Sequence, residues 1–225
     1  MRALESVLLD VDGTLVDSND AHARAWVEAC GEAGHEVSFE AVRRLIGMGG
    51  DNLLETLLGL APDDPRSGAL RERRKAIYKQ RHLPRVQPFP RVRELLERMK
   101  AAGYRLVVAT SSSQDDLRPT LELAGVSDLI DDATTADDAE TSKPAPDIVT
   151  AAREKAGSAR DATLLLGDTP YDLEAARRAG VAAIALRCGG GGDRDRAGAA
   201  AIYDDPADLL AQWEASPLAS GAATP

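Results

Sequence analysis

Short apolar runs alternate along the chain with longer segments whose apolar positions recur at helical spacing. Apolar runs that end in polar residues predict buried parallel strands. The predicted strands are 6–9, 106–110, 132–135, 163–168, 181–186 and 201–203. Helical spacing lies between them, at 92–102, 114–124, 146–156 and 170–179. This alternation is typical of an α/β fold, and we predict a doubly wound, Rossmann-like parallel sheet.

One long stretch breaks this alternation, because residues 16–83 carry no strand signal. Helical spacing predicts helices at about 18–35, 39–46, 51–58 and 70–80, with residues 62–65 as a loop. The block is too long for a simple crossover between strands, so it predicts an inserted domain with its own core. We therefore predict a catalytic core of residues 1–15 and 88–215, an all-helical insert of residues 16–87, and a disordered tail of residues 216–225.

Composition restricts the choice of partner. Hydrophobic residues make up 44% of the 225 residues and aromatic residues only 4%, and the formal net charge is -10. This charge argues against nucleic acid or an anionic membrane as a partner. No apolar run approaches membrane-spanning length, and Cys30 and Cys188 stand far apart. We expect a soluble cytoplasmic protein, with a monomer as the simplest state.

Polar residues gather where the predicted strands end. Asp10 and Asp12 follow the first strand, Thr110 ends the second, and Asp168 ends the fourth. The carboxyl ends of parallel strands share one edge of the sheet, where α/β proteins place their sites. Two carboxylates one residue apart could also form a plain strand-end turn. Their burial, however, would require a cation or hydrogen bonds, and a divalent metal would serve.

Four stretches together resemble the motif set of the haloacid dehalogenase superfamily. They are Asp10-Val11-Asp12-Gly13-Thr14, the strand that ends at Thr110, Ser142-Lys143-Pro144, and Gly167-Asp168-Thr169-Pro170-Tyr171-Asp172. The resemblance covers Val7 to about Leu210, and Asp12 is typical of the phosphatase and phosphomutase branch. It implies a helical cap over the active site, formed by the insert that follows the first motif.

The resemblance also implies roles for individual residues. Asp10 is the expected nucleophile, which forms an aspartyl phosphate, and Asp12 is the expected general acid and base. Hard oxygen ligands suit Mg²⁺, with Asp10, the backbone carbonyl of Asp12, and Asp168 as its protein ligands. Asp168 could instead cap the helix that follows it. Asp172 lies one helical turn further on, and we predict that it supports the site without binding the metal.

Phosphate contacts are expected from the second and third motifs. The Thr110 hydroxyl, the Ser111 N–H and the Lys143 ammonium would hold phosphate oxygens. His22 belongs to a His-Ala-Arg-Ala-Trp stretch that resembles one found in capped members, including sugar phosphomutases, so it either faces the substrate or packs in a core. The basic run 71–75 is expected to be a solvated helix face.

The predicted function is a Mg²⁺-dependent phosphatase that acts on a small phosphorylated metabolite. A hexose-phosphate phosphomutase is the alternative in chemistry, and a non-catalytic binding or regulatory protein on the same fold is the alternative of another class. In the resembled mutases the loop equivalent to residues 47–51 carries an arginine that grips a second phosphate. Gly50 stands there in this chain, which favours a hydrolase unless Arg44 or Lys75 replaces that arginine.

Overall fold

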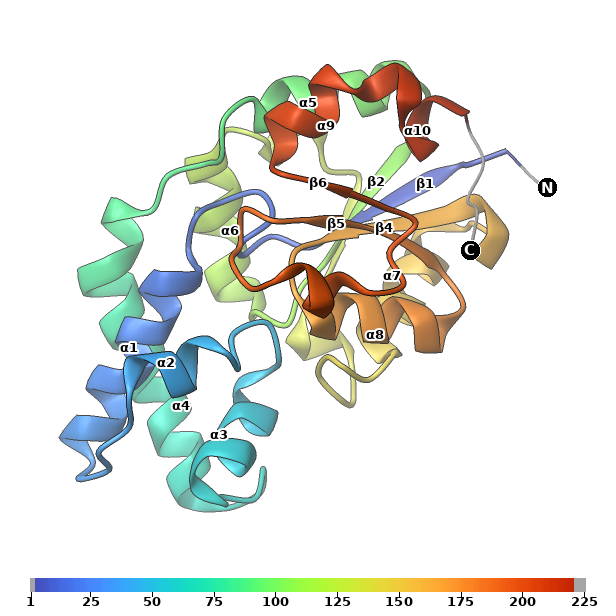
Figure 1. Ribbon diagram of the computed structural model, residues 1–225. Helices are drawn as coiled ribbons and strands as arrows, with labels where there is room; N and C mark the ends of the chain where they lie inside the picture. Colours follow the sequence, from blue (N-terminus) through green and yellow to red (C-terminus); the bar gives the residue numbers. More distant parts are fainter. Residues whose placement is uncertain (1–2, 221–225) are drawn as a thin grey trace.

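The computed structural model describes residues 3–220 and is organised around a parallel sheet (Figure 1). The sheet has six strands in the order β3-β2-β1-β4-β5-β6. The strands are β1 (Ser6–Leu9), β2 (Arg105–Ala109), β3 (Asp132–Thr134), β4 (Thr163–Gly167), β5 (Ala182–Leu186) and β6 (Ala201–Tyr203). Every neighbouring pair is parallel. The predicted doubly wound α/β core is confirmed.

Helices cover both faces of the sheet, and this explains why β1 is apolar throughout. Val7 and Leu9 point into a core beneath one group of helices, and Leu8 points into a second core beneath another. The first group is α5 (Val92–Ala101), α6 (Gln114–Ala124), α9 (Pro206–Ala211) and α10 (Pro217–Ser220). The second group is α7 (Asp147–Ala156) and α8 (Pro170–Ala179).

The insert forms a separate helical layer beside the sheet (Figure 1). It contains α1 (Asn19–Glu32), α2 (Phe39–Arg43), α3 (Gly50–Leu58) and α4 (Pro65–Ile77), which a π-helical turn extends over Tyr78–His82. Trp26, Leu53, Leu54 and Leu70 belong to a buried cluster made within this layer. The insert therefore has its own apolar core.

The chain enters and leaves the insert at one place. The N–H of Asp17 donates to the Gln87 carbonyl at 2.9 Å, and the N–H of Phe89 donates to the Leu15 carbonyl at 3.0 Å. The two connections thus lie side by side.

Two expectations about local structure are wrong. Helix α4 begins at Pro65, within the predicted loop 62–65, because the Asp64 side chain accepts the N–H of Arg66 and proline suits the first helical position. Residues 217–220 of the predicted disordered tail form α10, where Leu218 is buried and its carbonyl accepts the Tyr104 hydroxyl. Residues 221–225 lie outside the described residues.

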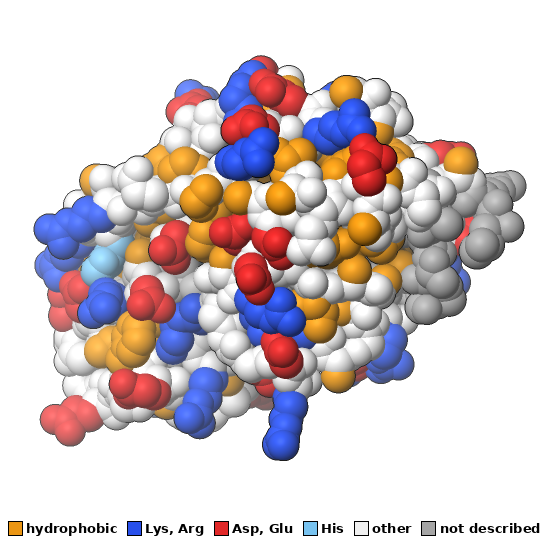
Figure 2. All heavy atoms as spheres, turned by 45° about the horizontal axis from the view of Figure 1, so that its top comes forward, with side chains coloured by type: hydrophobic (Ala, Val, Ile, Leu, Met, Phe, Trp, Pro, Cys, Tyr) orange, Lys and Arg blue, Asp and Glu red, His pale blue; other side chains and the backbone are white. Residues whose placement is uncertain are grey.

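Within residues 3–220, no helix combines the length and the apolar character needed to cross a membrane. On the face drawn in Figure 2, basic and acidic side chains lie interspersed.

Candidate active site

Asp10 follows the last residue of β1 and is almost fully buried. One carboxylate oxygen accepts the Lys143 ammonium at 2.7 Å, and the other accepts the Thr14 hydroxyl at 3.1 Å. Burial, and then repulsion from Asp172, raise the pKa of Asp10 to about 7 against the lowering effect of Lys143. Keeping the buried Asp10 carboxylate ionised therefore costs free energy unless a further cation lies beside it.

Asp168, which follows β4, faces Asp10 across the Thr14 hydroxyl, which lies 3.1 Å from an oxygen of each. Its other oxygen accepts the Asn19 amide at 2.8 Å. Gly13 is required here: its φ is +83°, and a Cβ on it would lie 2.4 Å from an Asp168 oxygen. Burial, and then the Asp10 and Asp172 charges, raise the pKa of Asp168 well above its usual value.

Asp10, Asp168 and Asp172 each offer an oxygen within 4.8 Å of the others. The Lys143 ammonium is fully buried and lies 2.7 Å from Asp10 and 2.6 Å from Asp172. Burial acts to lower the pKa of Lys143, but these two carboxylates raise it above its usual value, so the ammonium stays charged. One ammonium is shared by three clustered carboxyl groups, and their hard oxygen atoms suit Mg²⁺.

Asp172 is positioned by its own helix. One oxygen accepts the Thr169 N–H at 3.0 Å and the Thr169 hydroxyl at 2.6 Å, in a capping box at the start of α8. Its other oxygen contacts Lys143. Asp172 thus contacts both the start of α8 and the ammonium of Lys143. The capping residue of α8 is Thr169, so the alternative of Asp168 as a cap is not needed.

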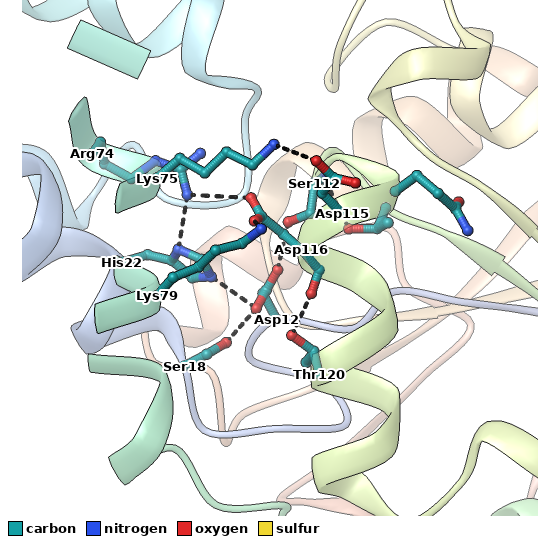
Figure 3. Close-up of polar contacts among 12 residues, drawn as sticks. Asp12, Ser18, His22, Arg74, Lys75, Lys79, Ser112, Asp115, Asp116 and Thr120 are labelled. Atoms are coloured by element: carbon teal, nitrogen blue, oxygen red, sulfur yellow. Dashed lines mark hydrogen bonds and ion pairs between the residues drawn. The ribbon is translucent and has the colours of Figure 1, made fainter. Parts of the chain in front are cut away.

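Asp12 points toward His22 and Ser18 of the insert (Figure 3). One oxygen accepts the Ser18 hydroxyl at 2.5 Å and lies 2.9 Å from His22 Nε2, and the other accepts the Ser112 hydroxyl at 2.9 Å. Burial acts to raise the pKa of Asp12, but electrostatic attraction to His22 and these hydrogen bonds hold it below its usual value. Asp12 is therefore held as an ionised carboxylate between the core and the insert.

A cavity lies between these carboxylates and the helical insert. Its residues come from the segment after β1, from the loop after β2 and from the insert: Asp10, Asp12, His22, Trp26, Ile46, Gly47, Met48, Gly50, Arg74, Thr110, Ser111 and Ser112. The Thr110 hydroxyl accepts the Ser112 N–H at 3.1 Å. The Ser111 hydroxyl is buried and has no hydrogen-bond partner among the described residues. Polar groups on this wall are thus available to a ligand.

Two side chains of the insert, those of His22 and Arg74, reach the cavity. His22 lines the cavity, and its ring stacks on Tyr78 with centroids 3.9 Å apart. Within the basic run, Arg73 is solvated and pairs with Glu32, but Arg74 turns inward to the cavity. The expectation of a solvated face is therefore wrong for Arg74.

Sequence reasoning missed several contacts at the site. Ser18 is the N-cap of α1, but its hydroxyl makes no capping bond and donates to Asp12 instead. Asn19 and Thr14 hold Asp168, and Ser112 holds Asp12. Of these residues, only Thr14 belongs to the motif that contains Asp10, so the sequence contains a signal for Thr14 and for none of the others.

The sequence of this chain matches a known family, the haloacid dehalogenase-like hydrolases. The model of that family matches residues 7–186, and the chain belongs to it. A protein of Dickeya dadantii, described as the probable phosphatase IndB, is 33% identical over 188 residues, which cover 81% of each chain. The predicted superfamily is confirmed.

Two solved structures are similar over almost the whole chain. A hydrolase from Pseudomonas syringae is 31% identical, with a TM-score of 0.87 over 94% of this chain and 98% of that one. A Bacteroides vulgatus protein, provisionally named beta-phosphoglucomutase, is 24% identical, with a TM-score of 0.86 over 97% and 90% of the two chains. This second likeness concerns the fold alone.

Proposed function

We propose that this protein is a Mg²⁺-dependent phosphatase that hydrolyses a small phosphomonoester through an aspartyl phosphate on Asp10. The observation that carries this proposal is the buried contact of Asp10 with Lys143 at 2.7 Å, on the wall of a cavity that Asp12 also lines. A nucleophile, a fixed positive charge and a second carboxylate are the groups that phosphoryl transfer requires. Membership of the hydrolase family and similarity to a phosphatase support it.

Asp10 would attack phosphorus, so that an Asp10–phosphorus bond forms as the bond from phosphorus to the ester oxygen breaks. Asp12 is ionised in the free protein, so it would first take up a proton from the phosphate monoanion of the substrate and then give that proton to the departing alkoxide. In the second half, Asp12 would take a proton from water, and the resulting hydroxide would release phosphate and the free Asp10 carboxylate. Lys143 would neutralise phosphate oxygens throughout, with the Thr110 hydroxyl and the Ser111 N–H as further donors.

Asp10, the Asp12 carbonyl and Asp168 would hold Mg²⁺, which supplies charge neutralisation for the phosphate and the nucleophile when bound. Residues 16–87 would act as a cap that excludes water from the cavity, with hinges near residues 16–17 and 86–87. The two segments that connect the cap to the core lie side by side at these positions, so the cap would rotate about them as one rigid unit.

Hydrolysis of p-nitrophenyl phosphate by the purified protein tests the proposal. We expect activity with Mg²⁺, loss of that activity with excess EDTA, and recovery when Mg²⁺ is restored above the EDTA concentration. A protein that binds phosphorylated ligands but releases no nitrophenol under any metal condition would contradict the proposal and favour a non-catalytic role.

Asp12→Ala is expected to slow hydrolysis by about a hundredfold or more, because neither leaving group nor water then has a proton partner. The loss should be smaller for p-nitrophenyl phosphate, whose leaving group needs little protonation, than for an alkyl phosphate. Rapid-quench measurement of the phosphoenzyme would separate the two half-reactions. Equal rates in the variant and the wild type would assign the proton transfer to another group.

A phosphomutase is the second candidate, because a cation of the insert, Arg74, lines the cavity where a second phosphate could bind. The test is glucose 1-phosphate, in both anomeric forms, with a catalytic amount of glucose 1,6-bisphosphate. We expect inorganic phosphate to appear faster than glucose 6-phosphate. The reverse order would replace the phosphatase proposal with a mutase.

A further inference from the structure

Arg74 is a charged residue of the cavity that has no role in the proposed hydrolysis of a simple phosphate ester. It lies on α4, and its side chain is only 16% exposed. Its guanidinium lies 5.2 Å from the centre of the Trp26 ring and 3.5 Å from His22 Nδ1. These contacts aim a planar cation at the cavity from the insert (Figure 3).

The charge of Arg74 is incompletely balanced by the protein. Its nearest carboxylate, Asp116 on α6, is 4.0 Å away, and Lys79 approaches the same carboxylate to 3.3 Å. Nε of Arg74 is buried, with no hydrogen-bond partner in the described part of the chain. Burial lowers the pKa of Arg74 even though Asp116 and then Asp12 act to raise it. A buried guanidinium with unused donors is a site for an anion.

The position of Arg74 limits what that anion can be. His22 lies between Asp12 and Arg74, in contact with both, so the guanidinium is separated from the proton-transfer carboxylate by the width of one imidazole ring. An anion at Arg74 would therefore belong to the same small molecule as a phosphate placed at Asp10. We propose that Arg74 recognises a second anionic group, a carboxylate or a phosphate, close to the scissile phosphate. The inference rests on the proposed phosphatase function.

Neither of the two cations that the sequence offered instead, Arg44 and Lys75, lines this cavity. Lys75 reaches Asp115 on α6 at 3.3 Å, and Arg44 lines a different cavity, beside Asp168 and Tyr171. A Cβ on Gly50 would lie 2.9 Å from the Trp26 ring, so a longer side chain there would have to displace the tryptophan. The alternatives that the sequence offered, Arg44 and Lys75, are thus directed elsewhere.

Matched pairs of substrates test the inference by the ratio of kcat/KM within each pair. The carboxylate pair is 2-phosphoglycolate against 2-hydroxyethyl phosphate, and the phosphate pair is propane-1,3-diol bisphosphate against propane-1,3-diol monophosphate. We expect the wild type to prefer the anionic member of at least one pair by about tenfold or more, a typical effect of a charged hydrogen bond. The pair that shows the preference identifies the anion.

Arg74→Met should reduce that preference by about 10- to 100-fold, and Arg74→Lys should retain part of it because the charge remains while the planar fork is lost. Arg73→Met, a neighbouring change at a solvated side chain, is the control and should keep the wild-type ratio. A wild type that hydrolyses p-nitrophenyl phosphate but prefers neither anion would overturn the inference alone, as would a preference unchanged in both Arg74 variants. A wild type that hydrolyses nothing would instead overturn the proposed function.

Discussion

Asp10→Asn is expected to lower hydrolysis of every phosphomonoester by more than about a thousandfold, to the limit of detection. The amide has the shape of the carboxylate, but it neither attacks phosphorus nor offers a negative charge to a metal. The measurement is kcat for p-nitrophenyl phosphate with saturating Mg²⁺. Asp204→Asn is the control, because Asp204 is exposed and pairs with Arg187 at 2.8 Å, away from the cavity. It should leave kcat unchanged.

The Asp10→Asn variant should keep its fold. Burial and repulsion raise the pKa of Asp10 to about 7, so ionised Asp10 costs stability that a neutral amide does not. Lys143 retains its contact with Asp172. We therefore expect an unfolding temperature, measured in EDTA, that is equal to the wild type or higher. Residual activity above a few per cent would assign the nucleophile elsewhere, and a large fall in the unfolding temperature would attribute lost activity to unfolding.

The catalytic edge of the sheet could be predicted because it depends on strand ends alone. Asp10, Thr110 and Asp168 each stand where an apolar run stops, and parallel strands bring such positions together. Lys143 is different, since it lies in a loop between β3 and α7 and no periodicity places it. Its expected position came from the family resemblance, and its 2.7 Å contact with Asp10 agrees with that expectation.

The wall formed by the insert could not be predicted, because it depends on which face of each helix meets the core. Arg73 and Arg74 are neighbours on α4, yet one is solvated and the other lines the cavity. Successive residues on a helix differ by about 100° in direction, so a basic run contains both kinds of position. The pattern of charges along a helix predicts solvent exposure only for the run as a whole and not for each side chain. The Arg74 side chain is held inside by its contacts with Trp26 and Asp116.

The contacts of Asp12 with Ser18 and His22 could not be predicted from the sequence either. Ser18 stands at the N-cap of α1, and the sequence left open whether His22 packs in a core or faces the substrate. The docking of α1 against the end of β1 gives them a shared partner instead. Such contacts arise from tertiary packing, which local propensity does not encode.

Lys143→Met is expected to remove activity and also to destabilise the fold, unlike Asp10→Asn. The ammonium is fully buried between Asp10 and Asp172, and its loss leaves two buried carboxylates without their partner. Breaking a buried ion pair in this way costs about 3–5 kcal/mol. Urea unfolding in EDTA measures the cost. Lys100→Met is the matched control, since Lys100 pairs with Asp131 at 2.6 Å on the surface and should cost no more than about 1 kcal/mol.

The destabilisation by Lys143→Met should grow with pH, and this separates lost charge pairing from lost packing. Asp10 has a folded-state pKa of about 7, above that of an unfolded aspartate, so the folded state holds its proton more tightly and loses stability as the pH rises through that value. Lys143 lowers this pKa, and without it the carboxylate becomes still harder to ionise. The variant should therefore lie closer to the wild type at pH 5 than at pH 8. A deficit of equal size at both values would indicate that the methylene chain, rather than the ammonium, is what Lys143 contributes to stability.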